Sequence, residues 1–79
     1  MNKVTNSLIN KKFKHFKNKQ IYELIGFARH SETLEEMVVY RALYESKFGF
    51  GSLWIRPKKM FFEDVLYEGK QVPRFEIIS

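Results

Sequence analysis

Short segments rich in β-branched and aromatic residues recur along this chain at intervals of about ten residues, separated by turn-forming residues. They cover residues 13–17, 20–28, 37–44, 53–57, 60–67, 70–72 and 73–78. Strands of this length in so short a chain indicate a mostly β fold. We expect a five- to six-stranded SH3-like barrel or a strongly bent antiparallel sheet, with at most one short helical turn.

Three sequence signals place bends and turns. Asn18 follows the first segment and suits a hairpin bend, because asparagine tolerates a left-handed backbone. The segment 20–28 is apolar on both faces, which predicts a central or strongly curved strand with its bend at Gly26. The pair Glu68-Gly69 predicts a two-residue hairpin.

The stretch from Thr33 to Glu36 matches the pattern of a helix N-terminal capping box. A helix starting there would run through the Val38-Val39-Tyr40 triplet, whose side chains lose rotamer freedom in helices. We therefore predict a turn, or one helical turn at 33–36, followed by a strand.

The length of 79 residues allows one domain and excludes a two-domain enzyme. Eight Phe, four Tyr and one Trp supply a compact aromatic core. The chain has no Cys, which excludes disulfides, cysteine zinc sites and a thiol nucleophile. The sequence shows neither a signal peptide nor a membrane span, so we expect a soluble, cytoplasmic protein without membrane partners.

The net charge of +5 is concentrated near the N-terminus, where six lysines precede the first acidic residue, Glu23. Such a run binds phosphates through counterion release or serves as a solubilising tail. We expect a basic, flexible arm over residues 1–11 and one β domain over 12–79. Five of these lysines are candidates for electrostatic contacts with a ligand: Lys11, Lys12, Lys14, Lys17 and Lys19.

Six blocks match a known family in order: HFK, GFARHSET, VVYRALY, LWIRP, MF and EGKQVPRF, between residues 15 and 75. The chain resembles the bacterial DUF1653 family, small domains without an assigned function, so the resemblance implies a fold but no activity. It departs from the family pattern at Asn18, where glycine is usual, in the longer loop 45–52, and at Lys58 and Lys59.

The polar run Arg29, His30, Ser31, Glu32 and Thr33 contains the residue types of a hydrolytic triad. Neighbours on an extended chain point to opposite faces, and no nucleophile-elbow motif is present. Two alternatives remain open. The run caps a turn, with Ser31 or Thr33 bonded to backbone amides and Arg29 paired with Glu32 or a nearby acid, or it forms the rim of a binding surface.

A second candidate group consists of Trp54, Arg56 and Arg74. Trp54 and Arg56 share a strand face, and arginine suits phosphate, carboxylate and ring contacts. In the structural alternative, Trp54 anchors the core and Arg56 pairs with Glu63 or Asp64. Phe48 and Phe50 lie in a glycine-containing loop that is either an exposed docking tip or folds back over the sheet.

The leading hypothesis is a non-enzymatic recognition module for nucleic acid or an extended peptide. Its candidate binding residues are the two groups just described, with the lysine run assisting. One alternative is a small hydrolase or metal-dependent enzyme centred on residues 29–32, with His15 also considered as a ligand. Another is an accessory subunit that pairs a sheet edge with another protein. We expect no cofactor and no metal, and the oligomeric state stays open.

Overall fold

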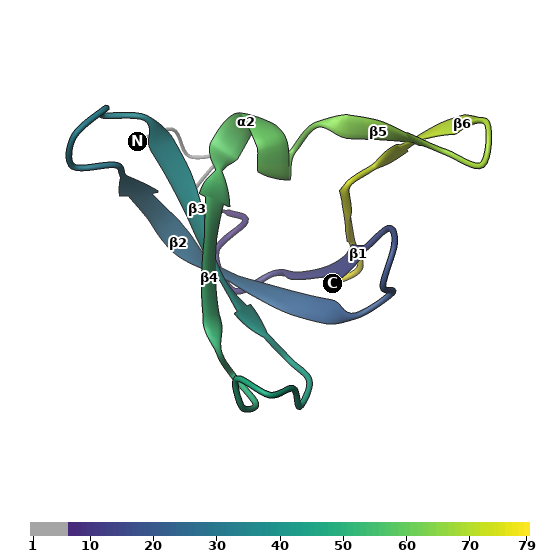
Figure 1. Cartoon of the computed structure of the whole chain (residues 1–79), viewed down its shortest axis with the longest axis horizontal. Helices are drawn as coiled ribbons and strands as arrows, with labels where there is room; N and C mark the ends of the chain where they lie inside the picture. Colours follow the sequence, from purple (N-terminus) through teal and green to yellow (C-terminus); the bar gives the residue numbers. More distant parts are fainter. Residues whose placement is uncertain (1–6) are drawn as a thin grey trace.

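Seven strands and one short helix form along residues 7–79, the part of the chain that the computed structural model describes (Figure 1). The prediction of a mostly β fold is confirmed. The strand number exceeds the predicted five to six, because the C-terminal third forms three very short strands. In chain order the elements are β1 (Lys12–His15), β2 (Ile21–Arg29), β3 (Glu36–Ala42), β4 (Leu53–Pro57), α2 (Lys58–Phe61), β5 (Asp64–Tyr67), β6 (Lys70–Pro73) and β7 (Phe75–Ile77).

The strands form two antiparallel sheets that do not close on themselves. Five strands pair in the order β4-β3-β2-β1-β7, and β5 pairs with β6 alone. Within residues 7–79, no pairing joins the edge strands β4 and β7, so the closed SH3-like barrel is not confirmed. The β5–β6 hairpin projects to one side of the larger sheet (Figure 1).

The long β2–β3 hairpin bends in its middle. Its register shifts between Leu24, which pairs with Tyr40, and Gly26, which pairs with Val39. The extra residue, Ile25, makes a β-bulge, and bulges bend and twist a strand. The bend predicted at Gly26 agrees with this shift.

Aromatic side chains fill the concave side of the bent sheet. Phe61 is fully buried, stacks on Phe75 at a centroid distance of 4.1 Å, and meets Phe13 edge-on at 5.3 Å. Ring pairs of this kind add to the free energy gained from burying apolar area. The buried core consists of Phe13, Tyr22, Leu24, Val38, Tyr40, Ala42, Phe61 and Phe75.

The helix α2 lies where the sequence predicted a strand. Pro57 precedes it with φ −53°, and the Phe62 amide closes its turn on the Lys58 carbonyl at 3.2 Å. This turn carries Phe61 into the core, whereas the adjacent Phe62 stays exposed. Of the two alternatives for residues 33–36, a non-helical turn forms before β3, because Leu34 has a left-handed backbone with φ 65°.

Both predicted hairpins form, but in one of them a residue other than the predicted one takes the left-handed conformation. Glu68 and Gly69 both have positive φ, as a type I′ turn between β5 and β6 requires. At the β1–β2 turn, Lys19 rather than Asn18 takes the left-handed conformation, with φ 61°. Asn18 instead accepts a hydrogen bond from the Gln20 amide at 2.8 Å through its side chain.

The chain before β1 runs along the sheet. The Asn10 amide donates to the Leu24 carbonyl at 2.7 Å, and the Leu24 amide donates to the Lys11 carbonyl at 3.0 Å. Leu8 and Ile9 pack against the core. Residues 1–6 of the arm expected over 1–11 lie outside the described part. Between Ser7 and Ser79, no helix has the length and apolar character needed to cross a membrane.

Candidate functional site

A small cavity of about 170 Å³ opens where β1, β2, β3, β4 and β7 come together. Antiparallel pairing brings its lining from segments far apart in the sequence, and the bend of the sheet curves those segments around it. We call it the arginine–tyrosine pocket. Its lining residues are His15, Asn18, Tyr22, Tyr40, Tyr44, Trp54, Arg56 and Phe75.

Three tyrosines place hydroxyl groups at this pocket. The hydroxyls of Tyr22 and Tyr44 share a hydrogen bond of 2.7 Å, and the Asn18 side-chain amide donates to Tyr22 at 3.2 Å. The hydrogen bond to Tyr22, with burial, raises the pKa of Tyr44 to about 12. Tyr44 is therefore neutral at physiological pH. The Tyr22 ring packs edge-on against the rings of Tyr40 and Tyr44, at 5.4 Å in each pair.

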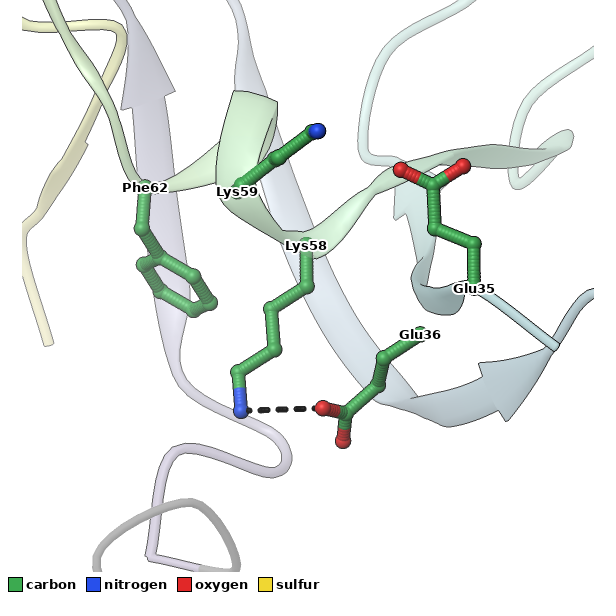
Figure 2. Close-up of a pocket in the computed structure, with 5 residues that line it drawn as sticks. All are labelled: Glu35, Glu36, Lys58, Lys59 and Phe62. Atoms are coloured by element: carbon green, nitrogen blue, oxygen red, sulfur yellow. Dashed lines mark hydrogen bonds and ion pairs between the residues drawn. The ribbon is translucent and has the colours of Figure 1, made fainter.

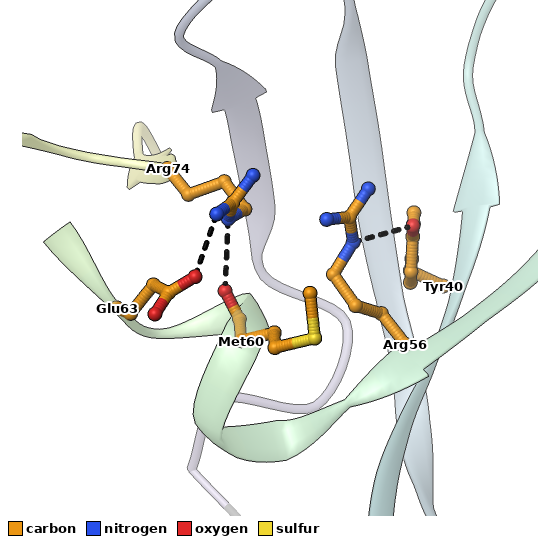
Figure 3. Close-up of polar contacts among 5 residues, drawn as sticks. All are labelled: Tyr40, Arg56, Met60, Glu63 and Arg74. Atoms are coloured by element: carbon orange, nitrogen blue, oxygen red, sulfur yellow. Dashed lines mark hydrogen bonds and ion pairs between the residues drawn. The ribbon is translucent and has the colours of Figure 1, made fainter. Parts of the chain in front are cut away.

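Arg56 lies at the pocket without a compensating acid. Its guanidinium carbon sits 5.6 Å from the Phe75 ring centroid, and its Nε donates to the Tyr40 hydroxyl at 3.4 Å (Figure 3). Within residues 7–79, no carboxylate pairs with Arg56, and none lines the pocket. Arginine donates through five N–H groups, so most of this donor capacity is left for a ligand.

His15 contributes another donor. Its Nδ1 accepts a hydrogen bond from the Lys17 amide at 3.2 Å, so in the neutral ring the proton lies on Nε2. Burial, assisted by the positive charges of Arg56, Arg74 and Lys17, lowers the pKa of His15. Three cations from different segments thus act on one ring.

Arg74 has a structural role at the neighbouring corner. Its guanidinium pairs with Glu63 at 2.6 Å and donates to the Met60 carbonyl at 3.1 Å (Figure 3). These contacts tie the start of β7 to α2. The structural alternative paired Arg56 with Glu63 or Asp64. Glu63 instead pairs with Arg74, and within residues 7–79 neither acid forms an ion pair with Arg56.

Trp54 lies at the rim of the pocket. It is 39% exposed, donates from its indole nitrogen to the Ser52 hydroxyl at 3.0 Å, and meets the Phe48 ring edge-on at 5.4 Å. It is not among the core residues, so the interpretation of Trp54 as a core anchor is wrong. Phe48 and Phe50 are 60% and 63% exposed, which matches the docking-tip alternative for their loop.

The polar run at residues 29–33 forms a self-contained turn between β2 and β3. His30 Nδ1 accepts from the amides of Glu32 at 3.1 Å and Thr33 at 3.3 Å. The Thr33 hydroxyl accepts from the Glu35 amide at 3.2 Å, and Arg29 donates to the Leu34 carbonyl at 2.7 Å. These contacts match the capped-turn alternative, although Arg29 binds a carbonyl and not an acid.

Within residues 7–79, no hydrogen bond joins the side chains of His30, Ser31 and Glu32 in this turn. Ser31 and Glu32 are exposed, and backbone amides already occupy His30 Nδ1. Between residues 7 and 79, no cluster of three or more potential metal ligands occurs. His15, the other histidine considered as a ligand, belongs to the arginine–tyrosine pocket.

The two groups predicted from the sequence lie apart. Arg29 lines a separate cavity with Phe27, Ala28 and Glu36, whereas Trp54 pairs across the sheet with Tyr40. Glu36 precedes Tyr40 by four residues, roughly 13 Å along a strand at about 3.3 Å per residue. The structure therefore does not bring Arg29 and His30 to the pocket of Trp54 and Arg56.

A larger and shallower hollow of about 370 Å³ lies between α2 and β3 (Figure 2). Its rim carries Glu35, Glu36, Lys58 and Lys59. Lys58 pairs with Glu36 at 3.4 Å and lies 5.4 Å from the Phe27 ring centroid. Because the charges of its acids and bases offset each other, this hollow favours neither an anionic nor a cationic ligand. It is therefore a weaker candidate for a binding site.

The candidate lysines follow β1 and its turn. Lys12 and Lys14 lie on β1, Lys17 and Lys19 lie in the β1–β2 turn, and Lys11 precedes the strand. All are exposed except Lys14, which is half-buried. The turn that holds Lys17 and Lys19 also supplies Asn18 to the pocket, and the charge of Lys17 acts on His15 of the pocket lining.

Sequence reasoning missed the three tyrosines as site residues and considered His15 only as a metal ligand. His15, Tyr22 and Tyr40 lie on strands, where alternation assigns the two tyrosines to the packed face, and Tyr44 lies just after the end of β3. The tyrosine side chain itself could have indicated the site, because a buried tyrosine needs a hydrogen-bond partner for its hydroxyl.

A family model described as a protein of unknown function, DUF1653, matches residues 11–77. A crystal structure of a DUF1653 protein from Bordetella bronchiseptica superposes with a TM-score of 0.77 at 28% sequence identity, covering 94% of this chain and 91% of that one. A comparison with curated proteins finds no match. The resemblance drawn from the sequence is confirmed, and the chain belongs to the DUF1653 family.

Proposed function

We propose that this domain is a recognition module for nucleic acid and that the arginine–tyrosine pocket binds one phosphate group of the ligand. The observation that carries the proposal is the lining itself: Arg56, His15 and the tyrosine hydroxyls supply donors, and no carboxylate of residues 7–79 lines the pocket. Charge-assisted hydrogen bonds from arginine to phosphate are short and strong.

The size of the pocket favours one group of a longer ligand. Pockets for whole small molecules usually enclose about 300–1,000 Å³. This pocket of about 170 Å³ takes a phosphate, and the rest of the ligand then lies along the surface. The half-exposed ring of Trp54 at the rim offers a platform for a base.

The surrounding charge supports an anionic polymer. Lys17 acts on His15 together with Arg56 and Arg74, and Lys19 follows in the same turn. Lysines that neutralise phosphates release counterions, which makes the affinity depend on salt.

The test is fluorescence anisotropy of a labelled single-stranded oligonucleotide at several salt concentrations. We expect log Kd to rise linearly with log salt, and Arg56→Met to weaken binding about 10- to 100-fold. The matched control is Arg41→Met, because Arg41 is exposed and alternates with Tyr40 onto the other face of β3. Equal losses in both variants would show non-specific attraction, and absence of binding would refute the proposal.

A second candidate function rests on β4, which is an edge strand. The Ala42 amide donates to the Ser52 carbonyl at 2.9 Å, so by alternation Ser52, Trp54 and Arg56 turn their backbone groups toward β3. Leu53 and Ile55 turn theirs outward, and their side chains are 61% and 58% exposed. Such an edge accepts an extended peptide or a strand of a partner subunit.

This candidate is separable from the first by one substitution. Ile55→Pro removes an outward amide that β3 does not use, so it blocks strand addition with little effect on the sheet. If sedimentation shows self-association that Ile55→Pro abolishes, the edge is the functional surface. A monomer that binds the oligonucleotide normally with Ile55→Pro favours the pocket.

A further inference from the structure

A second cavity, of about 160 Å³, is lined by residues of β1, the β1–β2 turn, the β5–β6 hairpin and β7. We call it the hairpin cavity. His15 lines both this cavity and the arginine–tyrosine pocket, so the two share one wall. The other lining residues of the hairpin cavity are Lys14, Phe16, Lys19, Tyr67, Val72, Pro73 and Glu76.

The hairpin cavity is built by contacts between the hairpin and the β1–β2 turn. The Phe16 ring meets the Tyr67 ring edge-on at 5.3 Å, and the Lys19 ammonium lies 5.2 Å from the Tyr67 ring centroid. Tyr67 is half-buried and lies at the turn end of the hairpin, where it pairs with Lys70. These contacts hold a ring and a cation beside His15.

The chemistry of the two cavities differs. The hairpin cavity presents aromatic rings, Val72 and Pro73, which suit a flat apolar group. Lys14 faces Glu76 across the β1–β7 pair, so these two charges offset each other and Lys19 supplies the uncompensated cation. The arginine–tyrosine pocket, in contrast, presents hydrogen-bond donors around Arg56.

From this arrangement we infer that the ligand is single-stranded and spans both cavities, with a phosphate against Arg56 and the base of the adjoining nucleotide against Tyr67. The inference rests on the proposed function and adds the ligand class and its minimum length of two nucleotides. His15 Nε2 donates to the strand as it passes from one cavity to the other. A duplex does not fit, because its bases are stacked and paired and cannot enter a cavity of this size.

The test compares four probes by heteronuclear NMR titration: inorganic phosphate, thymidine 5′-monophosphate, the 5′-phosphorylated dinucleotide pTpT and a short duplex. We expect phosphate to shift the Arg56 and His15 resonances alone. The dinucleotide should also shift Tyr67 and Val72, and it should bind about tenfold more tightly than the mononucleotide. The duplex should bind more weakly than the dinucleotide.

Variants separate this inference from the proposed function. Tyr67→Leu keeps apolar bulk but removes the ring, and we expect it to lower pTpT affinity about tenfold while phosphate binding is unchanged. The control Leu66→Ala alters the most exposed apolar side chain of the same hairpin, at 72%, and should change neither.

The remaining outcomes of the titrations would contradict one or both proposals. If pTpT binding needs Arg56 but ignores Tyr67→Leu, or if the duplex binds as well as pTpT, the two-cavity inference is wrong and the proposed function stands. If none of the four probes binds, both are wrong.

Discussion

The arginine–tyrosine pocket and the β2–β3 turn each contain an arginine and a histidine, but these side chains differ in what they bind. In the turn, Arg29 and His30 bond to backbone groups within five residues of themselves. In the pocket, Arg56 meets side chains from β3 and β7, and no carboxylate of residues 7–79 pairs with it. The dense polar run in the sequence thus marks a turn whose side chains form their hydrogen bonds within the turn.

The comparison shows what distinguishes a binding site in a domain this small. A turn consumes its donors locally and stays in place without a ligand. A pocket that collects donors from distant strands keeps hydrogen-bonding capacity free, because the sheet and not the ligand holds those side chains.

The largest effect concerns the ring beneath the pocket. Phe61 is fully buried between Phe13 and Phe75, and Tyr40 of the pocket packs against it at 5.3 Å. We expect Phe61→Ala to reduce the free energy of unfolding by about 3–5 kcal/mol, measured by urea denaturation. Leu34→Ala, in the exposed turn, is the control and should cost far less. Similar losses in both variants would contradict a pocket that depends on the core.

The tyrosine pair gives the next effect. Tyr44→Phe removes the 2.7 Å hydrogen bond to Tyr22 and should reduce the free energy of unfolding by about 0.5–1.5 kcal/mol. Tyr67→Phe is the comparison, because the Tyr67 hydroxyl makes no hydrogen bond within residues 7–79. Equal stability of the two variants in thermal unfolding would show that the pair does not order the pocket.

A substitution in the β2–β3 turn should be able to increase the stability of the protein without affecting the pocket. Leu34 is 63% exposed and has a left-handed backbone with φ 65°, a conformation that costs free energy for leucine. Asparagine tolerates this conformation, so Leu34→Asn should stabilise the protein by up to about 1 kcal/mol without changing oligonucleotide affinity. Loss of stability in this variant would mean that the Leu34 side chain has a packing role.

The smallest effect is a pH dependence. Burial and the neighbouring cations lower the pKa of His15, so the folded state favours its neutral form. This contributes stability that is complete above the ordinary pKa of about 6.5 and is lost as pH falls through the lowered pKa. His15→Gln should therefore lose less stability than the wild type on acidification, measured by denaturation at several pH values. Identical pH profiles would remove His15 from the account.

Local sequence patterns predicted the strands well but not the helix. Alternation and β-branched residues mark β2 and β3, and Glu68-Gly69 marks its hairpin, because these signals act within a few residues. Phe61 and Phe62 are adjacent and equally apolar, so only tertiary packing decides that α2 buries the first and exposes the second.

The site was harder to predict than the fold. Arg56 and Arg74 looked equivalent, and the corner before β7 decides that Arg74 takes Glu63. Tyr22 and Tyr40 looked like core residues because the concave face of the sheet is both core and pocket wall. Strand order and sheet curvature decide which polar groups remain free for a ligand. Neither can be predicted from one segment of the sequence.

The most direct test of the account is the pKa of the His15 ring, measured by NMR with and without saturating pTpT. An anion bound beside Arg56 favours the protonated ring, so the account predicts that the pKa of His15 rises on binding and that Arg56→Met removes the rise. An unchanged His15 titration, with resonance shifts confined to residues 29–36, would contradict it.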